Sequence, residues 1–108
     1  MVKLVWTDKA IEDLDDIGHY IAIDSEKYAK IVVQRLFKAV DVLEKHPRIG
    51  RIVPEFSDEN IRELINGSYR IVYTIKSQFQ IDILTIHHSA RLLNEEFLQK
   101  QSPSTISN

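Results

Sequence analysis

The chain has 108 residues, no cysteine, 44% hydrophobic and 28% charged residues. This length allows one domain with a modest core, and the lack of cysteine excludes disulfides and thiolate metal sites. The net charge is −2 and the pI is about 6.1, so the whole molecule is not a basic nucleic-acid binder. No apolar run is long enough for a membrane span or a secretory signal. We therefore expect a cytoplasmic protein with no membrane partner.

A strand followed by a helix is expected at the start of the chain. Residues 2–6 are mostly β-branched or aromatic, which favours a strand. Thr7 and Asp8 then have the composition of a helix N-cap and first turn. Gly18 lies within the helix, where we expect it to allow close packing against another helix, although glycine costs about 1 kcal/mol there relative to alanine. The apolar residues recur every three or four positions, at Ile11, Leu14, Ile17 and Ile21.

A second helix is expected to begin after Ser25 and to stop at His46-Pro47. The two helices carry opposite charge. Residues 8–26 hold seven acids against one base, whereas residues 27–51 hold seven bases against two acids. This asymmetry is typical of two solvated faces that attract each other, although a basic segment can also dock on an acidic partner or on phosphate. The apolar face of the second helix comprises Ala29, Val32, Val33, Leu36, Val40 and Leu43.

A β-hairpin is expected around the Asn-Gly pair at residues 66–67, the strongest short-range turn signal in the chain. Strands at residues 61–65 and 69–75 flank this turn, and a third strand at residues 79–86 completes an antiparallel meander. Pairing across the turn gives the register Leu64–Tyr69, Glu63–Arg70 and Arg62–Ile71.

Residues 46–60 predict a long connection, because they contain two prolines, one glycine and no sustained period. Long ordered loops are often functional. A short helix is expected within residues 87–97, and residues 99–108 are expected to form a flexible polar tail, which places a single domain at residues 1–98. The order β-α-α-β-β-β predicts an α+β domain with a helical hairpin packed on one face of a mostly antiparallel sheet.

The residues that could carry chemistry form a cationic and aromatic set on the predicted sheet and long loop. The set comprises Arg48, Arg51, Arg62, Tyr69, Arg70, Tyr73, His87, His88 and Arg91. Arginine binds phosphate or carboxylate through two parallel hydrogen bonds, and tyrosine can stack on a base or transfer a proton. We expect no metal and no cofactor, because His87 and His88 are adjacent on a strand and point to opposite faces. Purely structural roles stay open: the tyrosines can belong to the core, and Arg70 can pair with Glu63 across the strands.

Five short motifs follow one another over nearly the whole chain, up to about residue 93. They are Trp6-Thr7 before the first helix, Pro47-x-x-Gly50-Arg51-x-Val53-Pro54-Glu55, Ile61-Arg62-Glu63-Leu64, Tyr69-Arg70-Ile71-Val72-Tyr73 and His87-His88-x-x-Arg91-Leu92. In this order they resemble the RelE/ParE superfamily, the small toxins of type II toxin–antitoxin systems. The resemblance implies a cognate antitoxin as partner. We expect an extended or helical antitoxin segment to lie over residues 27–51 or the sheet edge.

The resemblance also implies a cellular target. RelE-like members are ribosome-dependent endoribonucleases that cut mRNA without a metal. If this chain is such an interferase, Arg70 steadies the scissile phosphate and His87 or His88 is the natural base. ParE-like members instead poison DNA gyrase by binding. The candidate binding residues are Arg48, Arg51, Arg62, Tyr69, Tyr73 and Arg91.

Two departures from the RelE-like pattern favour the ParE-like interpretation. RelE-like enzymes carry lysines on the strand before the Tyr-Arg motif, where this chain has Ile61 and Glu63. They also carry a catalytic tyrosine near the C-terminus, where the nearest aromatic residue is Phe97, which has no proton to give. We therefore expect a gyrase-directed toxin, with an mRNA interferase and an inactive family member as alternatives.

Overall fold

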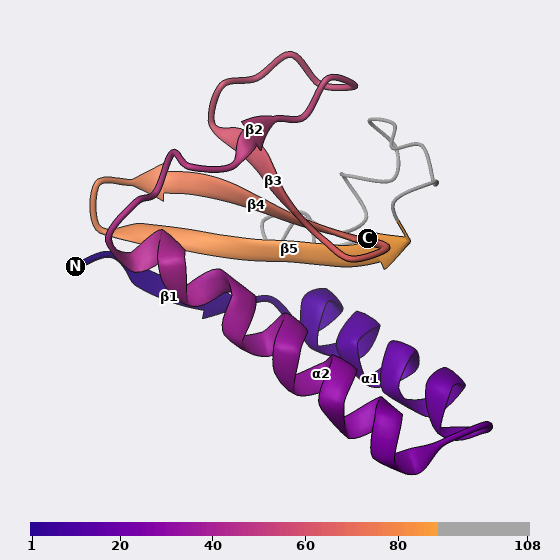
Figure 1. Cartoon of the computed structure of the whole chain (residues 1–108). Helices are drawn as coiled ribbons and strands as arrows, with labels where there is room; N and C mark the ends of the chain where they lie inside the picture. Colours follow the sequence, from indigo (N-terminus) through magenta and orange to yellow (C-terminus); the bar gives the residue numbers. More distant parts are fainter. Residues whose placement is uncertain (89–108) are drawn as a thin grey trace.

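The computed structural model describes residues 1–88, in which two helices pack on one side of a five-stranded sheet (Figure 1). The elements are β1 (Lys3–Trp6), α1 (Asp8–Ala22), α2 (Glu26–Ala39), the 3-10 helix η1 (Val40–Glu44), β2 (Arg51–Ile52), β3 (Ile61–Asn66), β4 (Tyr69–Ser77) and β5 (Gln80–His88). The strand order is β1-β5-β4-β3-β2, with β1 parallel to β5 and all other pairs antiparallel. The predicted α+β class is confirmed, and the structure adds the short strand β2 within the predicted loop.

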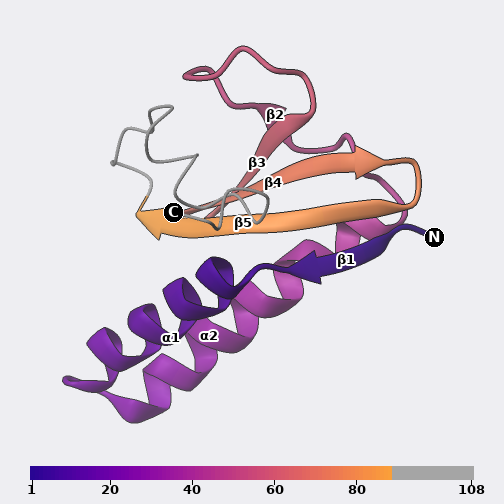
Figure 2. The ribbon, with the colours of Figure 1, turned by 180° about the vertical axis from the view of Figure 1, so that it is seen from behind.

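The two helices form an antiparallel hairpin whose connecting turn projects beyond the sheet (Figure 2). Both begin at the predicted caps, since Thr7 and Ser25 each accept the backbone N–H of the residue three positions later. Such a cap stabilises a helix by about 1 kcal/mol. A Cβ added to Gly18 would lie 2.9 Å from Cγ2 of Val33. The close packing predicted for this glycine is therefore confirmed.

The α-helical part of the second helix is shorter than predicted. It ends at Ala39, and the chain continues as the 3-10 helix η1 instead of running as an α-helix to the proline. The β-branched residues Val40 and Val42 disfavour the α-helix slightly. In a 3-10 helix, residues three apart lie on the same side, so Val40 and Leu43 are both buried in the core.

The main core lies between the helices and the inner face of the sheet. Its buried members are Ala10, Leu14, Val32, Leu36, Val40, Leu43, Ile71, Tyr73, Ile81, Ile83 and Ile86. A smaller cluster lies on the outer face, where residues of the β2–β3 loop cover the sheet. This cluster contains Val53, Val72 and Leu84, with Phe56 and Ile61 packed against it. The sheet is thus covered by helices on one face and by the loop on the other (Figure 1).

The register of the β3–β4 hairpin differs from the prediction. Tyr69 lies opposite Asn66 instead of Leu64, because the two turn residues are Gly67 and Ser68 instead of Asn66 and Gly67. Gly67 adopts a φ of +59°. A left-handed φ of this kind is what glycine allows in a tight hairpin turn. All three predicted pairs are therefore displaced by two residues. A shift of two keeps every side chain on its own face of the sheet.

Helix α1 completes the hydrogen bonding of β5 where that strand extends beyond β1. The hydroxyl of Thr7 donates to the carbonyl of Ile83 at 2.9 Å. One carboxylate oxygen of Asp13 accepts from the hydroxyl of Thr85 and from the backbone N–H of Ile86. The start of α1 therefore acts as the neighbour that the free part of β5 would otherwise lack.

Strand β5 extends two residues further than predicted and includes His87 and His88. The rest of the helix expected within residues 87–97, together with Arg91 and the predicted tail at residues 99–108, lies outside the described residues. Among residues 1–88, no helix combines the length and the apolar character that crossing a membrane requires.

Candidate functional site

The predicted site residues are divided between the two faces of the sheet. Arg70 and His87 lie opposite each other on β4 and β5, and Arg70 shares the outer face with the smaller apolar cluster. Tyr69 and His88 form the next opposite pair, and their rings meet edge to face with centroids 6.1 Å apart. His87 is buried and His88 is exposed. The two histidines therefore point to opposite faces, as predicted.

Arg70 lies at the centre of a chain of alternating charges, in which Arg70 and Glu63 are buried and Arg51 is exposed. Its Nε donates to Glu63 at 2.5 Å, and its Nη1 and Nη2 each donate to a different carboxylate oxygen of Glu55 at 3.0 Å. The other oxygen of Glu63 accepts from Nε of Arg51. We call Arg51, Glu63, Arg70 and Glu55 the Arg70 network. The ion pair that the sequence allowed between Arg70 and Glu63 is thus confirmed, as a contact between diagonal neighbours.

The network keeps Arg70 charged and covered. The hydrogen bonds to Glu55 raise the pKa of its guanidinium, burial acts in the opposite direction, and Glu63 adds to the rise. The side chains of Arg70 and Glu63 are only 6% and 0% exposed. A phosphate could reach the guanidinium only by displacing a carboxylate that binds it bidentately.

Arg62 ties both ends of the long connection at residues 46–60 to β3. Its Nη1 donates to the carbonyls of Arg48 and Gly50 at 3.1 and 2.9 Å, and its Nε donates to the carbonyl of Glu59 at 2.8 Å. The side chain of Arg48 is itself exposed, 3.7 Å from the carboxylate of Glu59. The guanidinium of Arg62 is therefore hydrogen-bonded to backbone carbonyls of the connection that precedes β3.

Tyr73 binds the beginning of the same loop from within the core. Its hydroxyl donates to the carbonyl of Pro47 at 2.8 Å and accepts the N–H of Gly50 at 3.0 Å. Burial raises the pKa of the Tyr73 phenol, while the hydrogen bond from Gly50 and two nearby arginines oppose this rise. A Cβ at Gly50 would lie 2.6 Å from the Tyr73 hydroxyl, so only glycine fits there without displacement.

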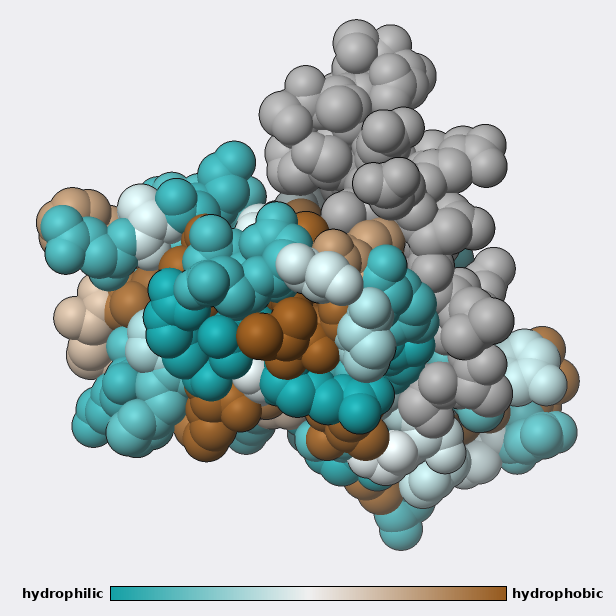
Figure 3. All heavy atoms as spheres, turned by 90° about the horizontal axis from the view of Figure 1, so that it is seen from above, coloured by the Kyte–Doolittle hydropathy of each residue, from teal (hydrophilic) through white to brown (hydrophobic). Residues whose placement is uncertain are grey.

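Two exposed arginines of the predicted site lie in and just before β2. The side chains of Arg48 and Arg51 are 55% and 61% exposed, and Ile49 and Ile52 beside them are also exposed. Seen from above the β2–β3 loop, the molecule presents apolar surface enclosed by hydrophilic residues (Figure 3). This mixture of cations and aliphatic side chains suits contact with a protein better than contact with phosphate alone.

Two residues of functional interest were missed at the level of the sequence. Glu55 stands at the end of the motif that begins at Pro47, and it provides the bidentate partner of Arg70. Asp13 is one of several acids in the first helix, and it binds β5. Neither has a local signature, because both partners lie far away along the chain. Among residues 1–88, no group of three or more potential metal ligands is brought together.

Comparison with known proteins identifies relatives along almost the whole domain. Residues 4–93 match the family described as ParE toxin of type II toxin-antitoxin system, parDE. Y4kP of Sinorhizobium fredii, which is named as a toxin, is 33% identical over 90 residues, covering 81% of this chain and 88% of that protein. Toxin RelE2 of Caulobacter vibrioides is 32% identical over 92 residues, covering 85% of this chain and 100% of that protein.

Solved structures agree with these relationships. The chromosomal ParDE system from P. aeruginosa contains a chain that is 28% identical, with a TM-score of 0.68 and coverage of 82% of this chain and 96% of that chain. The toxin–antitoxin complex RelBE2 from Mycobacterium tuberculosis shares the fold, at 19% identity and a TM-score of 0.54 over 81% of this chain and 96% of that chain. The chain therefore belongs to the ParE toxin family, within the RelE/ParE superfamily of type II toxin–antitoxin toxins.

Proposed function

We propose that this chain is a cytoplasmic ParE-like toxin that stops growth by binding DNA gyrase, and that a cognate antitoxin neutralises it. The observation that carries the proposal is the covering of Arg70, whose guanidinium is held by Glu55 and Glu63. The ParE family match and the relative from a ParDE system also support the ParE-like interpretation.

Metal-free RNA cleavage needs a cation at the phosphate, a base and an acid on one accessible surface. Arg70 is nearly buried, and His87 opposite it is buried as well. His88 is exposed, but it belongs with Tyr69 on the other face. This distribution argues against a phosphate site at Arg70 and favours a toxin that acts by binding.

The proposal is tested with the purified chain and DNA gyrase. We expect inhibited supercoiling and accumulated gyrase–DNA cleavage complexes. Replacing the exposed arginines together, Arg48→Ala with Arg51→Ala, should weaken this inhibition, whereas Lys45→Ala, an exposed cation outside β2, should leave it unchanged. If gyrase supercoils and cleaves normally at every toxin concentration, the proposal is wrong.

A second candidate function, ribosome-dependent mRNA cleavage, is favoured by the name of the relative RelE2. Mapping the 5′ ends of a translated reporter mRNA after induction distinguishes the two. Growth arrest with intact mRNA supports the gyrase proposal. In-frame cuts that disappear in a folded Arg70→Ala variant support the interferase. Soluble protein without arrest or cuts supports an inactive family member.

The antitoxin part of the proposal rests on the relatives from the ParDE and RelBE2 systems. We expect the product of the neighbouring small gene to co-purify with this chain and to restore growth when both are expressed. Growth that stays arrested despite an excess of that product would remove it as the antitoxin without affecting the gyrase assay.

A further inference from the structure

The Asn-Gly pair at residues 66–67 does not form the turn that the sequence predicts. Gly67 and Ser68 are the two turn residues, and Asn66 is the last residue of β3, opposite Tyr69. Gly67 has a φ of +59°, whereas the φ of Ser68 is not positive, a combination typical of a type II′ turn with glycine in its first position. Asn66 therefore precedes the turn, and its side-chain amide has another partner.

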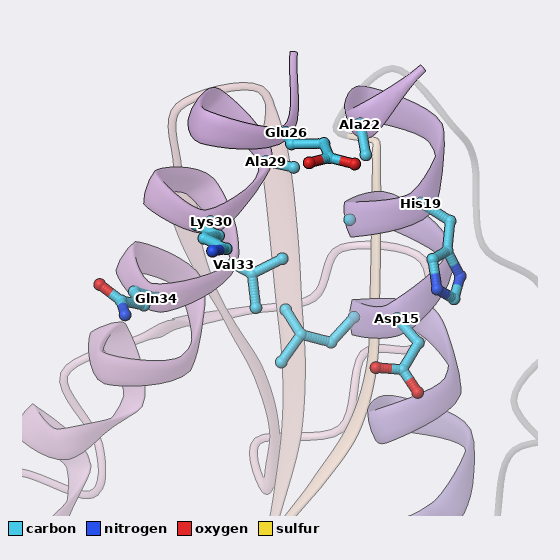
Figure 4. A pocket seen from close by; sticks show the side chains of 10 residues that line it. Asp15, His19, Ala22, Glu26, Ala29, Lys30, Val33 and Gln34 are labelled. Atoms are coloured by element: carbon cyan, nitrogen blue, oxygen red, sulfur yellow. The ribbon is translucent and has the colours of Figure 1, made fainter. Parts of the chain in front are cut away.

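That partner is a side chain of the second helix. In Figure 4, Lys30 and Gln34 line the groove between α1 and α2, and the strands run behind the two helices. Arg35, the residue after Gln34, points instead to the strands, and its Nε donates to Oδ1 of Asn66 at 2.8 Å. Its Nη2 lies 2.9 Å from the position that a Cβ of Gly67 would occupy. One guanidinium therefore covers the amide of Asn66 and the backbone of Gly67.

The backbone nitrogen of Gly67 lies next to this amide along the chain and is open to reaction. Among residues 1–88, no acceptor receives its N–H. Glycine has no side chain to obstruct an approaching group, and Gly67 is exposed to water. Asn66 is the only asparagine in the sequence that glycine follows. An electrophilic amide, an unhindered nitrogen and a fixed positive charge thus lie together at the end of β3.

We propose that Asn66 is a site of spontaneous deamidation. The nitrogen of Gly67 loses its proton to a base in the solvent and attacks Cγ of Asn66. The bond between Cγ and Nδ2 then breaks, and Nδ2 takes up a proton and leaves as ammonia. The product is a cyclic succinimide that joins residues 66 and 67. Water adds to either carbonyl of this ring and opens it, which gives aspartate or isoaspartate at residue 66.

Arg35 accelerates the closure of the ring. Negative charge develops on Oδ1 of Asn66 as the nitrogen attacks, and this oxygen already accepts the hydrogen bond from Nε. A donor aimed at an oxygen on which charge develops stabilises the transition state. The nearby positive charge also favours loss of the proton from the nitrogen of Gly67. Because Arg35 and Gly67 are both exposed, the amide can turn toward the nitrogen without disturbing the core.

The two products have different consequences for the hairpin. Aspartate leaves the backbone unchanged and places a carboxylate beside Arg35, so the hydrogen bond becomes an ion pair. Isoaspartate carries the main chain through Cβ and Cγ, which lengthens the backbone by one atom directly before the turn. The pairing of Asn66 with Tyr69 then no longer fits, and the ring of Tyr69 is the one that meets His88. Either product adds one negative charge to a chain whose net charge is −2.

Peptide mapping by mass spectrometry, after incubation of the folded full chain at mildly alkaline pH, tests the proposal. Asn60 is the internal control. It is more exposed than Asn66, but the β-branched Ile61 follows it, and the N–H of Ile61 donates to the carbonyl of Asp58 at 3.0 Å. We expect Asn66 to exchange its NH2 for OH at least about tenfold faster than Asn60, because only Asn66 has an unhindered nitrogen beside it. Exposure alone predicts the opposite order.

Three variants complete the test, and circular dichroism checks that each is folded. Asn66→Gln keeps an amide but would have to close a larger ring, so it should abolish the modification at residue 66. Arg35→Ala should slow the modification of Asn66, whereas Lys38→Ala, which removes another exposed cation of α2, should not. An amide of Asn66 that persists, or equal rates at Asn60 and Asn66, would overturn the proposal. An equal or faster rate in Arg35→Ala would overturn the role of the guanidinium.

Discussion

Glu55 reaches Arg70 from the β2–β3 loop, and its two carboxylate oxygens each accept a hydrogen bond of 3.0 Å from the guanidinium. One residue belongs to the loop and the other to a central strand, so this contact fixes the loop over the outer face of the sheet. Glu63 binds the same guanidinium from β3. The arginine that the superfamily resemblance assigns to phosphate is thus also the residue that ties loop to sheet.

Removing the buried carboxylate of this network should be strongly destabilising. Glu63→Ala leaves the buried charge of Arg70 without one of its partners, which typically lowers the free energy of unfolding by about 3–5 kcal/mol. Urea denaturation measures the loss. Glu59→Ala, an exposed member of a 3.7 Å ion pair, is the matched control and should be close to wild type. Equal stability of the two variants would show that the network contributes little.

Tyr73→Phe should loosen the start of the loop. The variant keeps the ring in the core but leaves the buried N–H of Gly50 and the carbonyl of Pro47 without the hydroxyl. A buried unsatisfied group costs about 1–3 kcal/mol. Tyr28→Phe, which removes an exposed hydroxyl from α2, should be neutral. Thermal unfolding of the two variants decides, and equal melting temperatures would contradict the assigned hydrogen bonds.

The same tyrosine should make stability fall at alkaline pH. Burial raises its pKa in the folded state above the ordinary value of 10.0. A raised pKa means that the unfolded chain loses the proton first, so the contribution is complete below pH 10 and is lost as the pH rises through the folded pKa. Urea midpoints of wild type and Tyr73→Phe should therefore converge as the pH rises above 10. Parallel curves would exclude this role.

Gly50→Ala should destabilise the protein more than Gly18→Ala. The new Cβ at residue 50 would meet the Tyr73 hydroxyl at 2.6 Å and the backbone carbonyl of Glu63 at 2.7 Å. Overpacking of this kind typically costs about 1–3 kcal/mol. At residue 18 the neighbour is a single methyl group of Val33 at 2.9 Å, and alanine improves helix propensity by up to about 1 kcal/mol. Urea unfolding of both variants measures the order, and the reverse order would contradict it.

Asp13→Ala should be costly although the residue lies on a surface helix. Its carboxylate accepts from the backbone of Ile86 and the hydroxyl of Thr85, and it lies 2.9 Å from Nζ of Lys9. Because the N–H of Ile86 and the hydroxyl of Thr85 lose their acceptor, the free energy of unfolding should fall by about 1–3 kcal/mol. Asp15→Ala, an exposed position two residues later, should lose almost nothing. Hydrogen exchange at the amide of Ile86 should accelerate in the first variant only.

The features that could be predicted from the sequence are those with local physical causes. Thr7 and Ser25 cap the helices because their hydroxyls bind N–H groups three residues away, and Gly18 packs where the apolar stripe of its helix is interrupted. The family resemblance also rested on short motifs in order. It led to the family that the comparisons support.

The features that could not be predicted depend on contacts between distant segments. The hairpin register differs from the prediction because Gly67 and Ser68, and not Asn66 and Gly67, form the two-residue turn, and only the backbone geometry decides between these two positions. Strand β2 has two residues and exists because β3 is beside it. The partner of Arg70 came from a loop that has no periodicity. For the candidate site, most of the cationic residues could be identified from the sequence, but the carboxylates that bind them could not.

The parallel pairing of β1 with β5 has a consequence for synthesis. Lys3 pairs with Gln80 and Trp6 with Ile83. Strand β5 is the neighbour of β1 in the sheet, although it is the last strand in the described part of the chain. While the chain emerges from the ribosome, the helical hairpin can form early because its contacts are local. The first strand must wait until residue 83 has left the exit tunnel. A nascent chain truncated before residue 83 therefore has an incomplete sheet, and the toxin can complete its fold only after β5 has emerged.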